Sequence, residues 1–331
     1  MSEPIVLQQG VLYNEDCVTG AARHIPDGAV DLIVTDPPYG IEGDRLHRHY
    51  NRNEDYVTGG YVEIPWEDYG KFCTRWIDVA ERVLRPGGSF YIVSGYTNLS
   101  YILDALRSTR LREVNHLIWK YSFGVFTRKK YVSSHYHILF YEKPGGERTF
   151  HTEARYGLQE KTPNGRSLNN LDREDVWIIN REYKPARPKN KNELPLGLLT
   201  KILQYSSSEG DLVCDFFCGG FSTARAAMGL NRRFVGFEIS PEVFTVKGKE
   251  IENIEPGYLL PSQRAPAIIR VKNQGKRWTA EDRNRLIRHY TKLRGGGLSR
   301  RETVSALAEK LGRGRFAIER ALKKYLPEGS P

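Results

Sequence analysis

The chain has 331 residues, of which 39% are hydrophobic, 11% aromatic and 27% charged. This composition is typical of a globular protein and excludes disordered, collagen-like and coiled-coil chains, while the length predicts two or three domains. The formal net charge of +10 is concentrated at one end. The residues from Arg264 onward carry 18 Lys and Arg against 6 Asp and Glu, whereas the rest of the chain carries 32 against 34. Such a basic region favours contact with nucleic-acid phosphates, with a solvated basic appendage as the alternative.

The apolar runs and the cysteines predict a cytoplasmic protein. No run approaches the ~18 apolar residues of a membrane span, and the first 25 residues lack the pattern of a signal peptide. The four cysteines have neither the paired spacing of a zinc site nor the density of a secreted disulfide framework. We therefore expect reduced thiols and no metal site at Cys17, Cys73, Cys214 and Cys218.

The first half of the chain alternates predicted strands and helices. The β-branched run at 30–34 predicts a strand that stops at Asp36-Pro37-Pro38-Tyr39, because two prolines interrupt regular structure. Apolar residues at helical spacing predict a helix over 68–84, which Arg85-Pro86-Gly87-Gly88 ends. The other elements expected here are a strand at 89–93, a helix at 98–107 and strands at 114–119 and 135–141.

The second half resumes this alternation after a loop-rich insertion at about 143–191. We expect a helix at 195–205, a strand at 212–215, a helix from Thr223, a strand at 234–238 and a helix from Pro241. Strands that alternate with helices predict an α/β fold, a Rossmann-like, mostly parallel sheet covered by helices on both faces. The predicted domains are residues 1–254 and a small all-α domain at 276–328, joined by a Pro- and Gly-containing linker at 255–275.

The tetrapeptide Asp36-Pro37-Pro38-Tyr39 is the first candidate site. It follows a strand at the rim of an α/β sheet, where such folds bind ligands. Its carboxylate and the Pro37 carbonyl can accept the two hydrogens of an amino group on a planar ring, and Tyr39 can stack on that ring. The alternative is a turn without chemistry.

The second candidate site is the turn from Asp215 to Thr223, which contains Gly219 and Gly220. Glu238 ends the next predicted strand 23 residues after Asp215, matching the acidic residue that accepts ribose hydroxyls in nucleoside-binding α/β folds. No P-loop lysine follows, so a nucleoside triphosphate is not expected. The alternative is a helix N-terminus that only packs on the sheet.

Together the two motifs resemble those of the amino-group DNA methyltransferases, which use S-adenosylmethionine to methylate adenine N6 or cytosine N4. The tetrapeptide precedes the cofactor loop, an order similar to the circularly permuted beta class, whose target-recognition segment lies between the two motifs and falls here at about 145–190. Residues 81–90 and 11–17 resemble two further segments of that family. The resemblance covers residues 10–252 and implies the methyltransferase fold.

The resemblance implies roles for individual residues. The catalytic set is Asp36, Pro37, Pro38 and Tyr39. The set implied to bind S-adenosylmethionine is Asp16, Asp36, Asn192, Glu193, Pro195, Asp215, Phe216, Phe217, Cys218, Gly219, Thr223 and Glu238. The chain departs from the family at Phe216, where proline is usual, and at Phe221, where a second loop glycine is usual.

The chemistry required is direct in-line methyl transfer to the amino nitrogen of a flipped base, without a covalent intermediate. Adenine is the expected target, because Asp at the first tetrapeptide position is more usual in the adenine enzymes of the family, and cytosine N4 is the alternative. Two other hypotheses stay open: a non-catalytic DNA-binding protein on a methyltransferase fold, and methylation of RNA or a protein amide. Tyr121 and Phe123 either complete the stacking clamp or belong to the core.

The basic end of the chain predicts three short helices at 279–293, 299–311 and 315–325, which look like a helix-turn-helix with a start similar to the Myb/SANT group. The candidate nucleic-acid contacts are Arg315, Arg320, Lys323 and Lys324. The alternative is a protein-interaction bundle. The expected partner is double-stranded DNA, with nucleoid association through it, and a homodimer and a cognate restriction endonuclease are left open.

Overall fold

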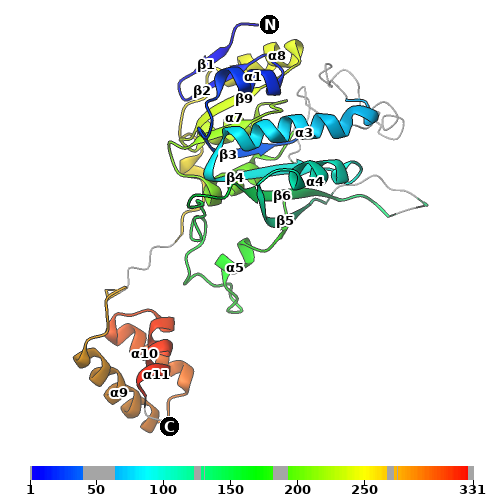
Figure 1. The fold of residues 1–331 in the computed structure, drawn as a ribbon. Helices are drawn as coiled ribbons and strands as arrows, with labels where there is room; N and C mark the ends of the chain where they lie inside the picture. The colour runs from blue at the N-terminus through cyan, green and yellow to red at the C-terminus, as the bar shows by residue number, and fades with distance from the viewer. Residues whose placement is uncertain are drawn as a thin grey trace. The chain divides into compact units, whose positions relative to one another are not determined.

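The computed structural model describes residues 2–39, 64–122, 128–129, 131–181, 193–266, 272–273 and 275–326. The chain forms two compact units, Met1–Pro266 and Ala267–Pro331. Figure 1 shows an α/β unit with a central sheet and a separate unit of three helices. None of the described helices is long and apolar enough to cross a membrane.

The described part of the first unit contains one nine-stranded sheet in the order β1-β2-β9-β8-β3-β4-β6-β5-β7. Its strands are β1 (Ile5–Leu7), β2 (Gly10–Tyr13), β3 (Val30–Thr35), β4 (Leu84–Ser94), β5 (Arg112–Lys120), β6 (His135–Glu142), β7 (Val176–Ile178), β8 (Leu212–Asp215) and β9 (Arg233–Phe237). The run from β2 to β4 is parallel throughout, β1 pairs antiparallel with β2, and β6 pairs antiparallel with β4 and β5. The predicted mostly parallel sheet is confirmed.

Helices cover both faces of this sheet, as predicted. One face carries α1 (Cys17–His24), α3 (Trp66–Val83) and α4 (Leu99–Arg107), and the other carries α6 (Leu196–Ser206), α7 (Ser222–Gly229) and α8 (Pro241–Ile251). Each group of helices buries an apolar stripe against the sheet, which gives two hydrophobic layers. Trp76 of α3, for example, is fully buried and packs edge-on against Phe90 of β4.

The strand β4 begins earlier than its sequence predicts. The helix α3 ends at Val83, but the chain continues directly as a strand through Pro86-Gly87-Gly88 instead of turning there. Gly87 has φ +76°, its N–H donates to the Lys143 carbonyl at 2.7 Å, and the backbone at Glu147 lies where a side chain of residue 87 would point. The glycine pair therefore serves a close backbone approach along an extended strand.

Short elements account for the other differences. The elements β1, β2 and α1 were not predicted, and the insertion at 143–191 contains α5 (Leu168–Asp172) and β7. Strands of three or four residues show no readable periodicity, so the pairing partner defines them. The strand β7 joins the sheet by pairing parallel with β5, and Trp177 is buried there.

The first unit extends to Pro266 and so includes part of the segment that the sequence assigns to the linker at 255–275. The N–H groups of Gly257 and Leu259 donate to the carbonyls of Met228 and Gly229, both at 2.9 Å, and the Leu259 side chain is buried over Gly229. The short 3-10 helix η2 (Leu260–Ser262) follows.

The second unit consists of α9 (Ala280–Gly295), α10 (Arg300–Leu311) and α11 (Arg315–Tyr325). Capping boxes start α9, between Thr279 and Asp282, and α10, between Ser299 and Glu302. Apolar side chains from all three helices form a separate core. Arg313 is buried between α10 and α11, stacks on Trp278 at 4.2 Å and pairs with Asp282 at 2.7 Å, so it fixes the start of α9.

Candidate active site

Three neighbouring parallel strands bring the predicted motifs to one edge of the sheet. The strand β3 pairs with β8, and β8 pairs with β9. Asp36 follows β3, Asp215 is the last residue of β8 and Glu238 follows β9, so all three lie at the edge where open α/β sheets bind ligands. The hydroxyl of Thr35 donates to Asp215 Oδ1 at 2.8 Å and links the two motifs directly.

The tetrapeptide is held from outside by two helical regions. Tyr69 of α3 donates its hydroxyl to the Pro38 carbonyl at 2.8 Å, and the Asn98 amide, just before α4, donates to the Tyr39 carbonyl at 2.6 Å. The carbonyl of Pro37 accepts no hydrogen bond from any described residue. The loop therefore presents one carbonyl that remains available to a ligand.

The Asp36 carboxyl lies in an environment that favours its neutral form. Burial and, more weakly, the nearby Asp215 raise its pKa to about 8, against opposing effects of the Tyr39 hydroxyl and of Arg181. Tyr39 donates its hydroxyl to Asp36 Oδ1 at 2.7 Å. A strongly raised pKa at a ligand-binding edge is typical of a functional carboxyl group.

This environment predicts that Asp36→Asn stabilises the fold at alkaline pH. Because the folded-state pKa lies above the ordinary value of 3.8, ionised Asp36 destabilises the native state, and the penalty grows between about pH 4 and pH 8. We expect the variant to match the parent at pH 4 and to exceed its free energy of unfolding at pH 8.5 by at least ~1.4 kcal/mol, equivalent to one pKa unit. Denaturant titrations at the two pH values measure this, and equal stability at pH 8.5 would contradict it.

The turn from Asp215 to Thr223, here called the glycine loop, is hydrogen-bonded to Glu238. One carboxylate oxygen of Glu238 accepts from the Gly219 N–H at 2.8 Å and the other from the Ser240 N–H at 2.8 Å. Burial raises the pKa of Glu238, and these two N–H groups oppose the effect. The lone pairs that remain on the two oxygens can accept hydroxyl groups of a ligand.

Phe221 has a left-handed backbone conformation at the position where the family usually has a second loop glycine. Phe221 has φ +59°, a conformation that costs a non-glycine residue on the order of 1–3 kcal/mol. The side chain offsets part of this cost, because it is 1% exposed and packs edge-on against Phe244 of α8. The departure at this position therefore changes the packing and preserves the turn.

Two predicted cofactor residues turn their side chains into the core. Phe216 is 1% exposed and packs against Trp76 and Phe237. Cys218 is buried, and burial raises the pKa of its thiol well above the usual range. Only backbone atoms of these two residues can contact a ligand. Phe217 is half-buried, and Thr223 is buried with its hydroxyl hydrogen-bonded to Asp215.

The remaining predicted cofactor residues lie around this loop. Asp16 follows β2, the neighbour of β9, and caps α1 by accepting from N–H groups of its first turn. Glu193 Oε1 accepts from the Ser222 hydroxyl at 2.8 Å, and Pro195 is the N-cap of α6. Asn192 lies outside the described residues.

An aromatic cluster beside the tetrapeptide was only partly predicted. Tyr136, at the start of β6, stacks on Tyr39 with ring centroids 5.8 Å apart and on Trp119 of β5 at 5.4 Å. Tyr121 is buried in the same cluster, 5.7 Å from Tyr136, whereas Phe123 lies outside the described residues. The sequence signal for this cluster is the placement of aromatic residues at the ends of two predicted strands.

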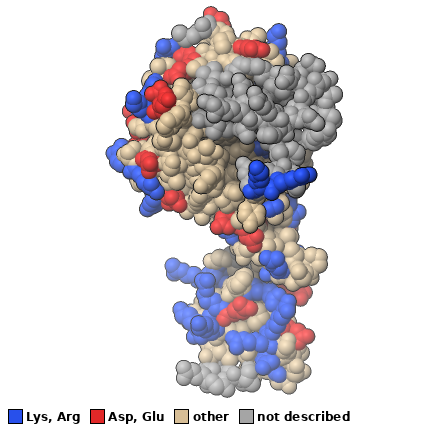
Figure 2. All heavy atoms as spheres, turned by 90° about the vertical axis from the view of Figure 1, so that its right-hand side faces the viewer, with Lys and Arg blue, Asp and Glu red and all other residues tan. Residues whose placement is uncertain are grey.

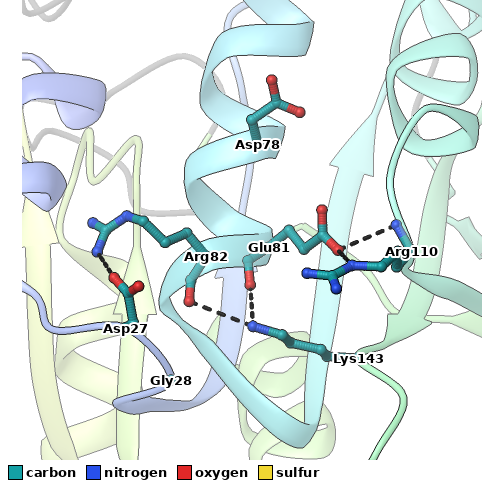
Figure 3. A pocket seen from close by; sticks show the side chains of 7 residues that line it. All are labelled: Asp27, Gly28, Asp78, Glu81, Arg82, Arg110 and Lys143. Atoms are coloured by element: carbon teal, nitrogen blue, oxygen red, sulfur yellow. Dashed lines mark hydrogen bonds and ion pairs between the residues drawn. The ribbon is translucent and has the colours of Figure 1, made fainter.

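A hollow of about 390 Å³ lies at the opposite edge of the sheet, near the end of α3 (Figure 3). Several of its polar groups pair with each other: Lys143 donates to the carbonyls of Glu81 and Leu84 at 2.6 and 2.8 Å, Arg110 pairs with Glu81, and Arg82 pairs with Asp27. Lys143 therefore caps the carboxyl end of α3, and these residues have a structural role. In the described ranges, no group of three or more His, Cys, Asp or Glu is placed to hold a metal ion.

The chain is similar in sequence to known proteins. Residues 30–248 match the sequence model of the N6/N4 methylase family, described as DNA methylase. The Type II methyltransferase M.BamHI of Bacillus amyloliquefaciens is 29% identical over 244 residues, 70% of this chain and 54% of that protein, so the chain spans about half the length of this relative. M.HpaI of Haemophilus parainfluenzae, also a Type II methyltransferase, is 28% identical over 248 residues, 72% of this chain and 73% of that protein.

Solved structures share the fold of the first unit. A proposed DNA modification methylase from Thermus thermophilus, solved in complex with S-adenosyl-L-methionine, is 23% identical with a TM-score of 0.51, over 77% of this chain and 96% of that one. The PvuII DNA methyltransferase, named as cytosine-N4-specific, is 13% identical with a TM-score of 0.58, over 80% of this chain and 97% of that one. At these identities the likeness concerns the fold alone.

Proposed function

The chain belongs to the N6/N4 DNA methylase family, and we propose that it transfers the methyl group of S-adenosylmethionine to the exocyclic N6 of an adenine in duplex DNA. The observation that carries this proposal is the contact between the two motifs. Asp36 directly follows Thr35, whose hydroxyl donates to Asp215 at the start of the glycine loop. An amino group held at Asp36 would therefore lie beside a ligand held at that loop.

The loop and its surroundings fit S-adenosylmethionine. Glu238 offers carboxylate lone pairs for ribose hydroxyls, and Asp16 lies on the adjacent strand end, where the resemblance places the adenine. Asp215, Gly219 and Glu193 surround the side assigned to the methionine, and Gly220 leaves that side open, since a side chain there would approach Glu193 within 3.2 Å. When bound, the cofactor supplies an electrophilic methyl group.

The tetrapeptide would prepare the amino nitrogen for attack. The lone pair of an exocyclic amino group is delocalised into the base, so the nitrogen is a weak nucleophile. Asp36 and the Pro37 carbonyl can accept its two hydrogens, which favours a pyramidal nitrogen with a localised lone pair, and both acceptors stabilise the positive charge that develops there. Tyr39 would stack on the base, which must leave the duplex at a cost of a few kcal/mol.

Identification of the methylated nucleoside tests the proposal. The full-length protein is incubated with labelled S-adenosylmethionine and unmethylated genomic DNA, and the DNA is digested to nucleosides for mass analysis. We expect N6-methyladenine. N4-methylcytosine would keep the mechanism and change the base, whereas cofactor binding without DNA methylation would contradict catalysis on DNA and direct the assay to RNA and protein amides.

We further propose that the second unit binds the same DNA. A groove of about 700 Å³ between α10 and α11 is lined by Arg300, Arg301, Val304, Phe316, Glu319, Arg320 and Lys323. Figure 2 shows Lys and Arg side chains over much of this unit in that view. The groove contains two of the predicted contacts, Arg320 and Lys323. Lys324 is also exposed, whereas Arg315 is half-buried.

The groove also adds residues that the sequence did not single out. Arg300 and Arg301 come from the first turn of α10, and Phe316 is 69% exposed on α11. Four cations against one carboxylate favour a polyanion such as the DNA backbone. A homodimer and a cognate restriction endonuclease stay predictions.

A further inference from the structure

Arg181, which follows β7, lies over the aromatic cluster beside the tetrapeptide. Its guanidinium carbon is 4.7 Å from the ring centroid of Tyr121, 5.2 Å from that of Tyr136 and 5.8 Å from that of Trp119. The segment that leads to it is pinned against the end of β5, because Trp119 Nε1 donates to the Ile179 carbonyl at 2.8 Å and the Ile179 N–H donates to the Lys120 carbonyl at 3.0 Å. The position of this cation is therefore built into the fold.

The cluster connects Arg181 to Asp36. The Tyr39 hydroxyl donates to Asp36 at 2.7 Å, and the Tyr39 ring stacks on Tyr136. The guanidinium of Arg181 in turn lies over the ring of Tyr136. The charged and titratable groups that act on Asp36 come from four places. They are Tyr39 in its own loop, Asp215 at the end of β8, Tyr136 of β6 and Arg181 after β7. Among the described residues, Arg181 is the cation of this set.

Arg181 also differs from the arginines that serve packing elsewhere in the chain. Arg148 stacks on Phe140 and Phe150 but pairs with Glu142 at 2.7 Å, and Arg313 pairs with Asp282. Arg181 Nε is buried without a hydrogen-bond partner in the described structure, and no carboxylate there forms an ion pair with this arginine. The half-buried guanidinium is hydrogen-bonded to Tyr136, and without a paired carboxylate its positive charge can act on the half-buried Asp36.

We propose that Arg181 is a positioning residue for methyl transfer, which acts through the Tyr39–Tyr136 pair and favours the ionised form of Asp36, the form that accepts the hydrogens of the target amino group. This inference rests on the proposed function. The proposal also gives a function to the insertion at 143–191. The segment after β7 places the positive charge of Arg181 near Asp36, although the two residues are far apart in the sequence.

The pH dependence of kcat/KM tests this role in the full-length enzyme. We compare the parent with Arg181→Met, which keeps the length and stacking surface without the charge, and with Arg181→Lys, which keeps the charge. Since only ionised Asp36 is active in this scheme, each pKa unit gained by Asp36 lowers the rate tenfold at pH values below its pKa. We expect Arg181→Met to be slower than the parent at pH 7, by up to about tenfold, with the deficit shrinking towards pH 9.5.

Two comparisons separate a charge effect from a structural one. In Arg181→Lys, the acid limb of the pH profile of kcat/KM should lie within half a pH unit of that of the parent. Arg148→Met removes another ring-stacked arginine and should leave this limb unshifted. A deficit of Arg181→Met that is equal at pH 7 and pH 9.5 would overturn the proposal, as would an equal shift in Arg148→Met.

A readout without activity distinguishes failure of this proposal from failure of the proposed function. Stability at pH 8.5 is measured by denaturant titration for the parent, Asp36→Asn, Arg181→Met and the double variant. If Arg181 stabilises ionised Asp36, then Asp36→Asn must stabilise the Arg181→Met background more than the parent. If Asp36→Asn raises the free energy of unfolding equally in both backgrounds, the proposal is overturned, even if the parent methylates DNA. A larger increase in the Arg181→Met background would support the proposal, even if the methyl acceptor proves to be another molecule.

Discussion

Asp36→Ala is expected to lower the single-turnover rate of methyl transfer by at least about 10³-fold, because it removes an acceptor for the amino hydrogens and the negative charge that stabilises the developing cation. The affinity for DNA should change less than threefold, since Asp36 is a single side chain at the end of β3 and many other contacts would hold the duplex. Rapid-quench assays with saturating labelled S-adenosylmethionine measure the rate, and titration of labelled duplex measures the affinity.

A matched control lies on the same strand. Asp31 is at the other end of β3, where it pairs with Arg85 at 2.6 Å and accepts from the Leu212 N–H at 2.8 Å. Asp31→Ala should therefore destabilise the protein while the folded fraction keeps its methyl-transfer rate within a factor of a few. If Asp36→Ala keeps more than a tenth of the parent rate, the catalytic role of the tetrapeptide is contradicted.

The residues of the candidate site were predictable where a local pattern marks them. Asp36, Asp215 and Glu238 each lie at the carboxyl end of a short apolar strand, and parallel pairing brings these ends to one edge. The same rule accounts for the correct fold class. The strand order, with β6 and β5 antiparallel at one side, depends on side-chain packing between segments and was not readable from periodicity.

The rest of the site depends on contacts between distant residues. Tyr39, Tyr136 and Arg181 are separated by tens of residues in the chain, and no spacing rule connects them. Phe221 shows a related limit, because its sequence indicates a lost glycine, whereas its backbone keeps the left-handed turn and its ring fills a place against α8. Sequence patterns identify the candidate site residues here, and tertiary packing determines their charge state and support.

The basic groove of the second unit predicts a change in the salt dependence of DNA binding. Replacing Arg301, Arg320 and Lys323 by glutamine removes three exposed cations from one groove. Each phosphate contact contributes about 0.9 to the slope of log K against log salt, so we expect the slope to fall by up to about 2.7 and the affinity at low salt to fall about 10²-fold. Fluorescence anisotropy with a 30-base-pair duplex at several salt concentrations measures both quantities.

The helix α9 offers a control of equal charge. Arg285, Arg288 and Lys292 are exposed and do not line the groove, so their replacement by glutamine removes the same three charges from another surface. If the groove binds DNA, this second triple variant keeps most of the slope, because long-range attraction without direct contact is largely screened beyond about 10 Å at 0.1 M salt. Equal losses in the two variants would mean that only the total charge attracts DNA. An unchanged slope in the groove variant would instead favour a protein partner for the unit, since a protein interface does not require release of phosphate counterions.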